Sequence, residues 1–254
     1  EAPLVHGDGR STAMGWTAAL EALKARIDTL GESSVKALVS PFWSNEDLGA
    51  VSRLVESLGG GTVVFRCPRA DDEIPLPGYE GLARRKALAP NVQGAELLGC
   101  NRVGDDAGQG GLEDLVDHDG VVLVLGDALD DQPEGFAPNA AIVVYLGAYT
   151  SSALASADFQ FPVTTFAEQE GTFTNHAGRV QRFWPALSGP GAARPAWLVL
   201  GALLGALQGV EGPSRAEQAF GLVADAVESY KGLDYESIGA EGRPSGARVP
   251  VPGD

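Results

Sequence analysis

Residues suited to acid–base or metal chemistry are few in this sequence and lie far apart. The only tight cluster of histidine and carboxylates is Asp117, His118 and Asp119. A metal site needs side chains that converge from more than one element, whereas neighbouring residues of a helix or strand point in different directions. The triplet therefore predicts a surface helix end and no metal site, and His6 and His176 have no obvious partners.

The two cysteines, Cys67 and Cys100, do not form a recognisable chemical motif. They lie thirty-three residues apart and neither belongs to a CxxC pair, which disfavours a disulfide scaffold and a cysteine-built metal site. Lone cysteines most often behave as small buried hydrophobes, and we expect that role for both in a reducing compartment. No serine or cysteine stands in an elbow-type context, so a hydrolase triad is also poorly supported.

Two further patterns resemble functional motifs but favour simpler interpretations. The stretch GDDAGQGGLEDL (104–115) is glycine-rich and precedes a helix, but it lacks the lysine of a phosphate-binding loop and predicts a flexible turn. Glu168 and Glu170 would share a face of an extended segment. A glycosidase pair must come from facing walls of a cleft, so we interpret them as solvated charges.

Composition limits the partners of the chain. Its 254 residues are 44% apolar, which is enough for a substantial globular core. With 34 acidic and 18 basic residues the net charge is −16, which disfavours nucleic acid and anionic lipid as ligands. The longest apolar run, Pro195 to Val210, is shorter than the roughly 20 residues of a membrane-spanning helix. It predicts a buried helix and no direct membrane insertion.

Hydrophobic periodicity predicts an α/β fold with a mostly parallel, doubly wound sheet. A helix is expected over 15–30, and a strand–helix–strand unit over 35–66, in which Ser44 caps the helix and Asp47 completes a capping box. Buried strands are expected at 121–125 and in the segment from 140 to 164, and helices at 195–209 and 213–231. The connection 67–111 is irregular, and the tail after 231 is expected to be extended. We predict one domain over residues 1–254, with an alternative sub-boundary near residue 160.

The segment TFAEQEGTFTNHAGRVQRFWPAL, residues 165–187, fits neither of the regular patterns. It is too polar and too rich in glycine to be predicted as an ordinary helix or strand. Within it, EQEGTFTNHAGRVQR (168–182) resembles the C-terminal region of the largest iron–sulfur subunit of proton-pumping NADH:quinone oxidoreductase, respiratory complex I. The related molybdopterin oxidoreductases, such as formate dehydrogenase, carry a similar GTFTN…RVQ signature.

The resemblance extends over nearly the whole chain. The stretches SPFWSNEDLGAVSRLVESLG, APNVQGAELLG, VVLVLGDAL, SADFQFPVTTFAE and GPGAARPAWLVLGAL also resemble parts of that subunit, in the same order. It implies a molybdopterin-oxidoreductase-like α/β fold that is reduced in size. In catalytic relatives the matching segment runs beside a bound pterin dinucleotide, which implies Thr172, Thr174, Asn175 and Arg179 as vestigial pterin-loop residues.

Three departures from the catalytic family favour a scaffold over an enzyme. Neither cysteine lies in the motif that ligates molybdenum, the large inserted domain of the catalytic enzymes is missing, and the cysteine-rich regions that bind clusters in the complex I subunit are absent. We therefore expect no catalytic residue, no metal ligand and no cofactor in this region. The only methionine is Met14, so we expect the chain to be the C-terminal part of a longer one.

The resemblance leads to three functional hypotheses. The first is a non-catalytic scaffold domain of the large complex I subunit, which supports NADH-to-quinone electron transfer in the respiratory chain. It implies iron–sulfur clusters in a missing N-terminal part, FMN in a partner subunit, contacts with other peripheral-arm subunits, and a peripheral position on the cytoplasmic side of the inner membrane. The alternatives are part of a molybdopterin-dependent enzyme such as formate dehydrogenase, and a stand-alone acidic binding module.

Overall fold

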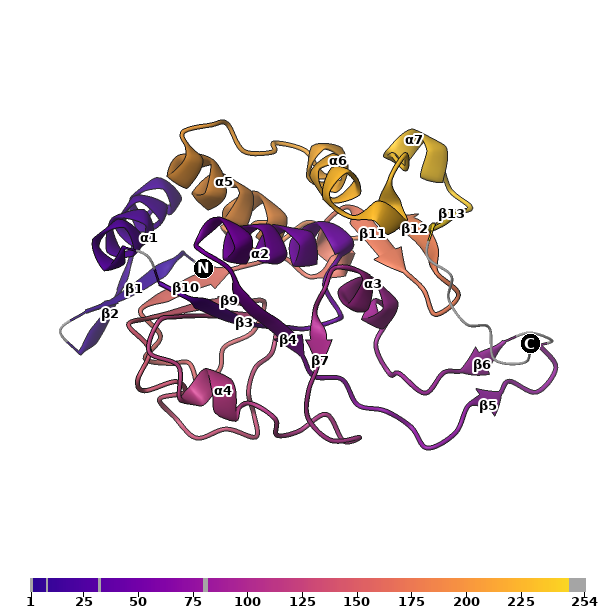
Figure 1. The fold of residues 1–254 in the computed structure, drawn as a ribbon, viewed down its shortest axis with the longest axis horizontal. Coiled ribbons are helices and arrows are strands. Elements are labelled where there is room, and N and C mark those ends of the chain that lie inside the picture. Colours follow the sequence, from indigo (N-terminus) through magenta and orange to yellow (C-terminus); the bar gives the residue numbers. More distant parts are fainter. Residues whose placement is uncertain (1, 8, 32, 80–81, 247–254) are drawn as a thin grey trace.

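The centre of the molecule is an eight-stranded sheet with both faces covered (Figure 1). The computed structural model describes residues 2–7, 9–31, 33–79 and 82–246. The strand order is β2-β1-β10-β9-β8-β3-β4-β7, and the strands from β10 to β7 are parallel. These strands are β1 (Leu4–Gly7), β2 (Arg10–Ala13), β3 (Val35–Val39), β4 (Gly61–Phe65), β7 (Asn101–Arg102), β8 (Val121–Leu125), β9 (Ile142–Gly147) and β10 (Phe159–Pro162). The predicted α/β fold with a mostly parallel sheet is confirmed.

Alternating side chains of the central strands feed two separate cores. In β8, Val121, Leu123 and Leu125 point into one core, whereas Val122 and Val124 point into the other. Successive side chains of a strand lie on opposite faces, so a strand covered on both sides must be apolar throughout. This explains why β8 and β9 read as continuous apolar runs.

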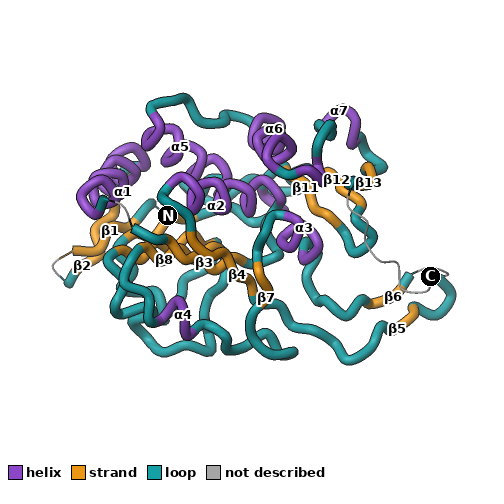
Figure 2. Tube along the Cα trace, viewed as in Figure 1, coloured by secondary structure: helices purple, strands orange, loops and turns teal. Residues whose placement is uncertain are grey.

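Helices cover one face of the sheet, and one short helix with long loops covers the other (Figures 1 and 2). The first face carries α1 (Trp16–Leu30), α2 (Asn45–Ser57) and α5 (Ala196–Gln208), with α6 (Ala216–Ala226) packed on α2 and α5. The second face carries α4 (Glu113–Val116) and the loops that follow β8 and β9. No helix of the described residues is long and apolar enough to cross a membrane.

The two best-predicted helices follow their sequence signals. In α1, Trp16, Leu23 and Ile27 are buried on one face, and the helix ends at Gly31, whose φ of 73° favours glycine. In α2, the Ser44 hydroxyl accepts from the Asp47 amide and the Asp47 carboxylate accepts from the Ser44 amide. This is the predicted capping box.

The segment after residue 165 was predicted poorly. Residues 171–183 form a hairpin of β11 (Gly171–Thr174) and β12 (Arg179–Phe183), to which β13 (Arg243–Pro244) adds a third strand. The expectation that this segment is too polar for a strand was wrong, because its threonines face an interior that is itself polar. A 3₁₀ turn, η1 (Phe166–Glu168), precedes the hairpin.

The C-terminal helix prediction also needs correction. The helix expected over 213–231 is shorter, because Val227 adopts an extended conformation, and a 3₁₀ turn, η2 (Glu228–Tyr230), follows. The tail is not simply extended: Asp234 caps a further helical turn, α7 (Tyr235–Ile238). The sub-boundary near residue 160 stays a prediction.

The long connection between β4 and β7 leaves the body of the molecule. It contains a two-stranded hairpin of β5 (Ile74–Pro75) and β6 (Ala83–Arg84), and then α3 (Val92–Leu97). Figure 1 shows the hairpin projecting far from the central sheet, while α3 returns to lie beside α2. The irregular connection predicted from prolines and glycines is therefore an arm followed by a helix.

Candidate functional site

The order of the parallel strands reverses between β3 and β8, which is where open α/β sheets bind ligands. Counted in chain order, the six parallel strands stand in the order 3-2-1-4-5-6. In such sheets the crevice lies at the carboxyl ends of the strands, at the point of reversal. Here Ser40 follows β3 and Gly126 follows β8, and the Ser40 amide donates to the Leu125 carbonyl at 2.9 Å.

The indole of Trp43 fills this crevice. Gly126 has a φ of 78°, and a Cβ atom on it would lie 2.3 Å from the ring of Trp43. Only glycine allows the ring and the backbone to approach so closely. Trp43 is buried, and its Nε1 has no hydrogen-bond partner among the described residues. The loop between β3 and α2 therefore covers the carboxyl ends of the strands with its own side chain.

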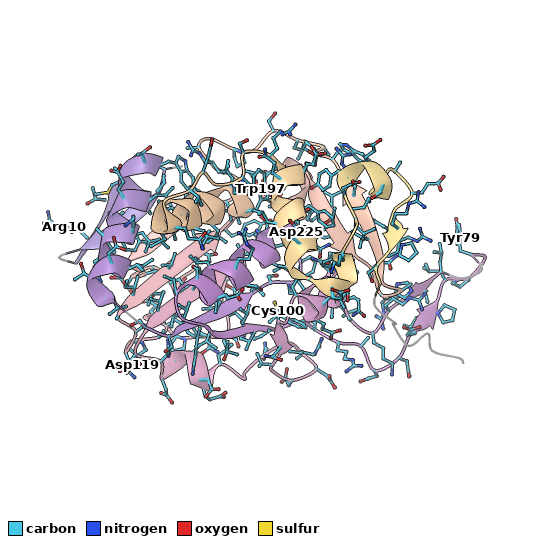
Figure 3. All side chains as sticks on the ribbon, turned by 45° about the horizontal axis from the view of Figure 1, so that its top comes forward. Arg10, Tyr79, Cys100, Asp119, Trp197 and Asp225 are labelled. Atoms are coloured by element: carbon cyan, nitrogen blue, oxygen red, sulfur yellow. The ribbon has the colours of Figure 1, made fainter. Side chains whose placement is uncertain are left out.

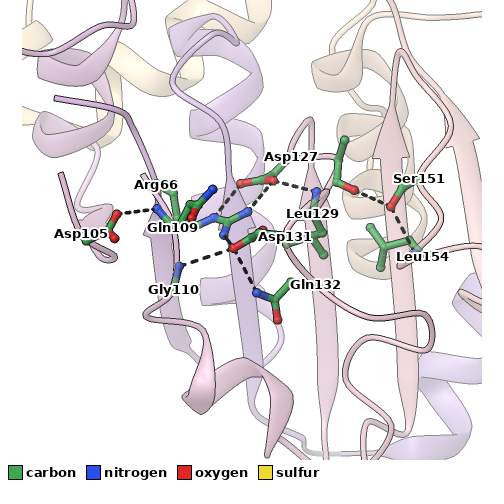
Figure 4. Close-up of polar contacts among 11 residues, drawn as sticks. Arg66, Asp105, Gln109, Gly110, Asp127, Leu129, Asp131, Gln132, Ser151 and Leu154 are labelled. Atoms are coloured by element: carbon green, nitrogen blue, oxygen red, sulfur yellow. Dashed lines mark hydrogen bonds and ion pairs between the residues drawn. The ribbon is translucent and has the colours of Figure 1, made fainter. Parts of the chain in front are cut away.

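The buried guanidinium of Arg66, which follows β4, donates three hydrogen bonds to two carboxylates (Figure 4). Its Nη2 donates to Asp127 Oδ1 at 2.9 Å, its Nε donates to Asp127 Oδ2 at 3.1 Å, and its Nη1 donates to Asp131 Oδ2 at 2.6 Å. Burial alone would lower the pKa of Arg66, but these two partners raise it. Hydrogen bonding to Arg66 lowers the pKa of Asp131.

The Arg66 cluster also holds a strained loop. Asp127 Oδ1 accepts from the Leu129 amide at 2.9 Å, and Leu129 has a φ of 55°. A leucine rarely adopts this left-handed conformation. The buried side chain of Leu129 and the bond from Asp127 together keep the β8 loop against the sheet.

A second cluster of polar side chains lies at the start of α2. It is covered by the β11–β12 hairpin, here called the signature hairpin because it carries the GTFTN…RVQ residues. Asn45, Glu46 and Asp47 are at most 1% exposed. Asp47 accepts from the Gln169 side chain at 2.6 Å and from the Trp197 amide at 2.8 Å. The first turn of α2 is thus surrounded by segments that lie more than a hundred residues away in the sequence.

Thr172 and Thr174 form the other side of this buried network. Asn45 Nδ2 donates to the hydroxyl of Thr172 at 3.0 Å and to that of Thr174 at 3.1 Å. Glu46 accepts from the Thr172 amide at 2.8 Å, from the Thr172 hydroxyl at 2.9 Å and from the Tyr235 hydroxyl at 2.8 Å. Both threonines have no exposed surface. These two predicted pterin-loop residues therefore bind the chain's own side chains.

Burial changes the acidity of the carboxyl groups in this network, most notably that of Glu46, which accepts three hydrogen bonds. Burial raises its pKa to about 7, although the donors Thr172 and Tyr235 partly offset that rise. Burial also raises the pKa of Asp47. The aromatic hydroxyl of Tyr235, buried against Glu46, has its pKa raised as well.

Asn91 joins the network to the strand-end crevice. Its Oδ1 accepts from the Thr174 amide at 2.8 Å, and its Nδ2 donates to the Trp43 carbonyl at 2.9 Å. Tyr230 completes the network through its hydroxyl, which lies 2.7 Å from the Thr174 hydroxyl. One amide side chain thus fixes both the signature hairpin and the loop that covers the crevice.

The other two predicted pterin-loop residues lie at the end of the hairpin: Asn175 in its turn and Arg179 at the start of β12. The Asn175 Oδ1 accepts from the Ala177 and Arg179 amides, each at 3.0 Å, which closes the turn. The guanidinium of Arg179 donates to the Gly242 carbonyl at 3.0 Å and is exposed. The four predicted residues therefore lie on one hairpin, but Thr172 and Thr174 face α2 and Arg179 faces the C-terminal strand β13. A pterin-binding role for them stays a prediction.

The remaining candidates from the sequence have structural partners. The triplet does lie at the end of α4, where Asp117 and Asp119 are exposed as predicted. His118 is buried and contacts the Ser34 carbonyl at 2.9 Å, so its expected surface position was wrong. Cys67 and Cys100 are buried, as predicted, and burial raises the pKa of Cys100 to about 12. Glu168 caps η1 through Thr165, and Glu170 pairs with Arg182.

No sequence pattern predicted the residues that organise the strand-end crevice and the buried network, namely Asn45, Glu46, Arg66 and Asn91. Acidic residues in a first helical turn are common for electrostatic reasons, so Glu46 carries no signal of burial. Arg66 directly follows a buried strand, and that position was the one available hint. The partners of all four are set by tertiary contacts that no local pattern encodes.

The chain is similar in sequence to known proteins. The sequence pattern of the family described as molybdopterin oxidoreductase matches residues 75–206, just over half of the chain. The F420-dependent formate dehydrogenase 2 subunit alpha of Methanococcus maripaludis is 37% identical over 89 residues, which are 34% of this chain and 13% of that protein.

The chain is also similar to subunits of NADH-ubiquinone oxidoreductase. The mitochondrial NADH-ubiquinone oxidoreductase 78 kDa subunit of Neurospora crassa is 37% identical over 82 residues, which are 32% of this chain and 11% of that protein. The Candida albicans protein of the same name is 38% identical over 66 residues. The chain thus matches only a small part of each relative's length. The family match and the mostly parallel α/β sheet lead to one conclusion: the chain belongs to the molybdopterin oxidoreductase family.

Proposed function

We propose that this chain is a non-catalytic scaffold domain of the large iron–sulfur subunit of an NADH:quinone oxidoreductase, and that it supports electron transfer by assembly. The observation that carries the proposal is the burial of Thr172 and Thr174, whose hydroxyls bond to Asn45 and Glu46. Side chains that hold a pterin would instead face a ligand. The similarity to the 78 kDa subunits of two fungi gives the proposal its context.

The strand-end crevice is a poor fit for a pterin dinucleotide. The ring of Trp43 lies against Gly126 at the strand ends, where open α/β sheets bind their ligands. Arg66, which follows β4, is already paired with Asp127 and Asp131, and those carboxylates would repel a pyrophosphate. The proposal therefore assigns no reaction step to this domain, and its clusters and flavin would belong to other parts of the complex.

The second candidate is part of a molybdopterin-dependent formate dehydrogenase. It is favoured by the 37% identity to a formate dehydrogenase alpha subunit. Under this alternative, Asn175 in the hairpin turn and Arg179 at the start of β12 would contact the cofactor once a further part of the protein encloses it.

Purification of the tagged full-length protein from its native source separates the two candidates. We expect flavin- and cluster-bearing subunits to co-purify with the tagged chain, and the purified complex to oxidise NADH. We also expect it to contain less than about a tenth of a molybdenum or tungsten atom per chain. Stoichiometric molybdenum or tungsten together with formate oxidation would overturn the scaffold proposal.

A matched pair of variants sharpens the metal measurement. Arg179→Ala alters the signature turn, whereas Arg215→Ala alters an exposed arginine outside it. Equal metal content and equal NADH oxidation for both variants would agree with a scaffold. A fall in bound metal for Arg179→Ala alone would support a cofactor contact.

A further inference from the structure

The segment from Pro68 to Pro90, here called the β5–β6 arm, has no buried residue among those described. At its root, Arg69 and Ala87 form an isolated bridge within the arm, and the Arg69 amide donates to the Asp106 carbonyl at 2.8 Å. Figure 1 shows the arm extending away from the sheet, and in Figure 3 Tyr79 lies at the outer end of the molecule.

The arm is rich in exposed apolar side chains. Five of the eleven exposed large apolar residues of the described chain belong to it: Ile74 (50%), Leu76 (47%), Tyr79 (66%), Leu82 (56%) and Leu88 (39%). Clustered exposed apolar residues mark interaction sites, whereas scattered ones are ordinary. A two-stranded hairpin is also only marginally stable by itself in water, so this arm gains order when another surface covers it.

The charges of the arm indicate the chemistry of that surface. Glu73 pairs with Arg85 at 2.8 Å, but Arg84 and Lys86 are exposed and form no ion pair within the part of the chain that the structure describes. They lie two residues apart in an extended segment and therefore share a face. On a chain with a net charge of −16, Arg84 and Lys86 thus place two positive charges side by side, next to the exposed apolar residues of the hairpin.

We propose that the β5–β6 arm is the docking surface for another protein subunit, whose matching surface is an apolar groove bordered by carboxylates. Ile74, Leu76, Tyr79 and Leu82 supply the apolar contact, and Arg84 and Lys86 select the acidic border. A lipid bilayer suits the arm less well, because the segment from Arg69 to Leu88 has four acidic residues beside its four basic ones. The inference rests on the proposed function, since it requires a multisubunit complex.

The test compares two sets of exposed apolar residues in the full-length tagged protein. The arm variant combines Ile74→Ser, Leu76→Ser, Tyr79→Ser and Leu82→Ser. The control combines Leu187→Ser and Val210→Ser, which are 64% and 60% exposed and lie elsewhere. Subunits that co-purify from native cells are quantified per tagged chain by mass spectrometry, and circular dichroism checks that both variants fold.

We expect the arm variant to lose at least one subunit of the complex tenfold or more, and the control to stay within twofold of the unaltered protein. Full retention of every subunit by the arm variant would overturn this inference alone. Failure of the unaltered protein to bring down any cluster-bearing subunit would overturn the proposed function and this inference with it.

A photo-cross-linking residue at Leu82 identifies what covers the arm in the purified complex. The expected product joins Leu82 to a subunit at a peptide that contains apolar residues and carboxylates, and Arg84→Glu with Lys86→Glu reduces its yield at least fivefold. Cross-links to lipid alone, with binding to phosphatidylglycerol vesicles that Arg84→Glu abolishes, would overturn the proposal in favour of a membrane surface.

Discussion

The buried network at the start of α2 and the β5–β6 arm both depart from the usual rule that polar side chains lie outside and apolar ones inside. The network places Asn45, Glu46 and Thr172 in the interior, while the arm places Ile74 and Tyr79 in solvent. Polar groups inside a protein must be satisfied, so they restrict the fold to one arrangement. Apolar groups outside stabilise the fold little and remain available for association. The comparison separates the part of the chain that specifies structure from the part that specifies a partner.

Removal of the Glu46 carboxylate should cause the largest loss of stability. In Glu46→Ala, the Thr172 amide and the Tyr235 hydroxyl lose a buried acceptor, each at a cost of about 1–3 kcal/mol. We expect the free energy of unfolding to fall by about 4 kcal/mol, as measured by urea denaturation. Glu236→Ala, at an exposed position of α7, is the control and should change it by less than about 0.5 kcal/mol. Equal losses for the two variants would show that the buried hydrogen bonds of Glu46 add nothing to the stability of the fold.

The second largest effect is expected in the pH dependence of the free energy of unfolding. Burial raises the pKa of Glu46 from 4.5 to about 7, so the folded state favours the protonated carboxyl. Its contribution is fully present below pH 4.5 and is lost as the pH rises to about 7. Relative to Glu46→Gln, the unaltered protein should lose on the order of 3 kcal/mol between pH 4.5 and pH 8. Parallel pH profiles for the two proteins would contradict the assignment.

Removal of the Thr172 hydroxyl alone should cause a smaller loss of stability. Thr172→Val keeps the shape of the side chain but removes the bond to Glu46 and the acceptor of Asn45. We expect a loss of about 1–2 kcal/mol in thermal or urea unfolding. Thr12→Val in the exposed strand β2 is the matched control and should be nearly neutral. A neutral Thr172→Val would show that the buried bonds add no net stability.

The smallest effect is expected in the arm. Tyr79→Ser removes a ring that is 66% exposed, so the free energy of unfolding of the isolated protein should change by less than about 0.5 kcal/mol. A loss above 1 kcal/mol would mean that the arm contributes to the fold itself, and that the contrast with the network is incomplete.

Local patterns predicted the elements whose signals lie within one segment. The capping box of Ser44 and Asp47 and the continuous apolar run of β8 are examples. The hairpin at 171–183 was missed because alternation normally places apolar residues inside, whereas here Thr172 and Thr174 face inward and Phe173 faces outward. Its inward-facing threonines are explained by α2, whose first turn lies beneath the hairpin and supplies their hydrogen-bond partners.

The candidate site was less predictable than the fold. The resemblance directed attention to Thr172 and Thr174, but their partners Asn45 and Glu46 lie more than 120 residues earlier in the chain. Neither spacing nor polarity marks a helix start that will be covered by a distant hairpin. Arg66 and its two aspartates are likewise joined only by the order of the strands.

Asn91 gives the arm a mechanical connection to the interior. It follows the last exposed residues of the arm directly, and its side chain holds both the Thr174 amide and the Trp43 carbonyl. At its other end the arm continues into β4 through Cys67. Tension from an attached neighbour would therefore reach the signature hairpin through Asn91 and the central sheet through β4.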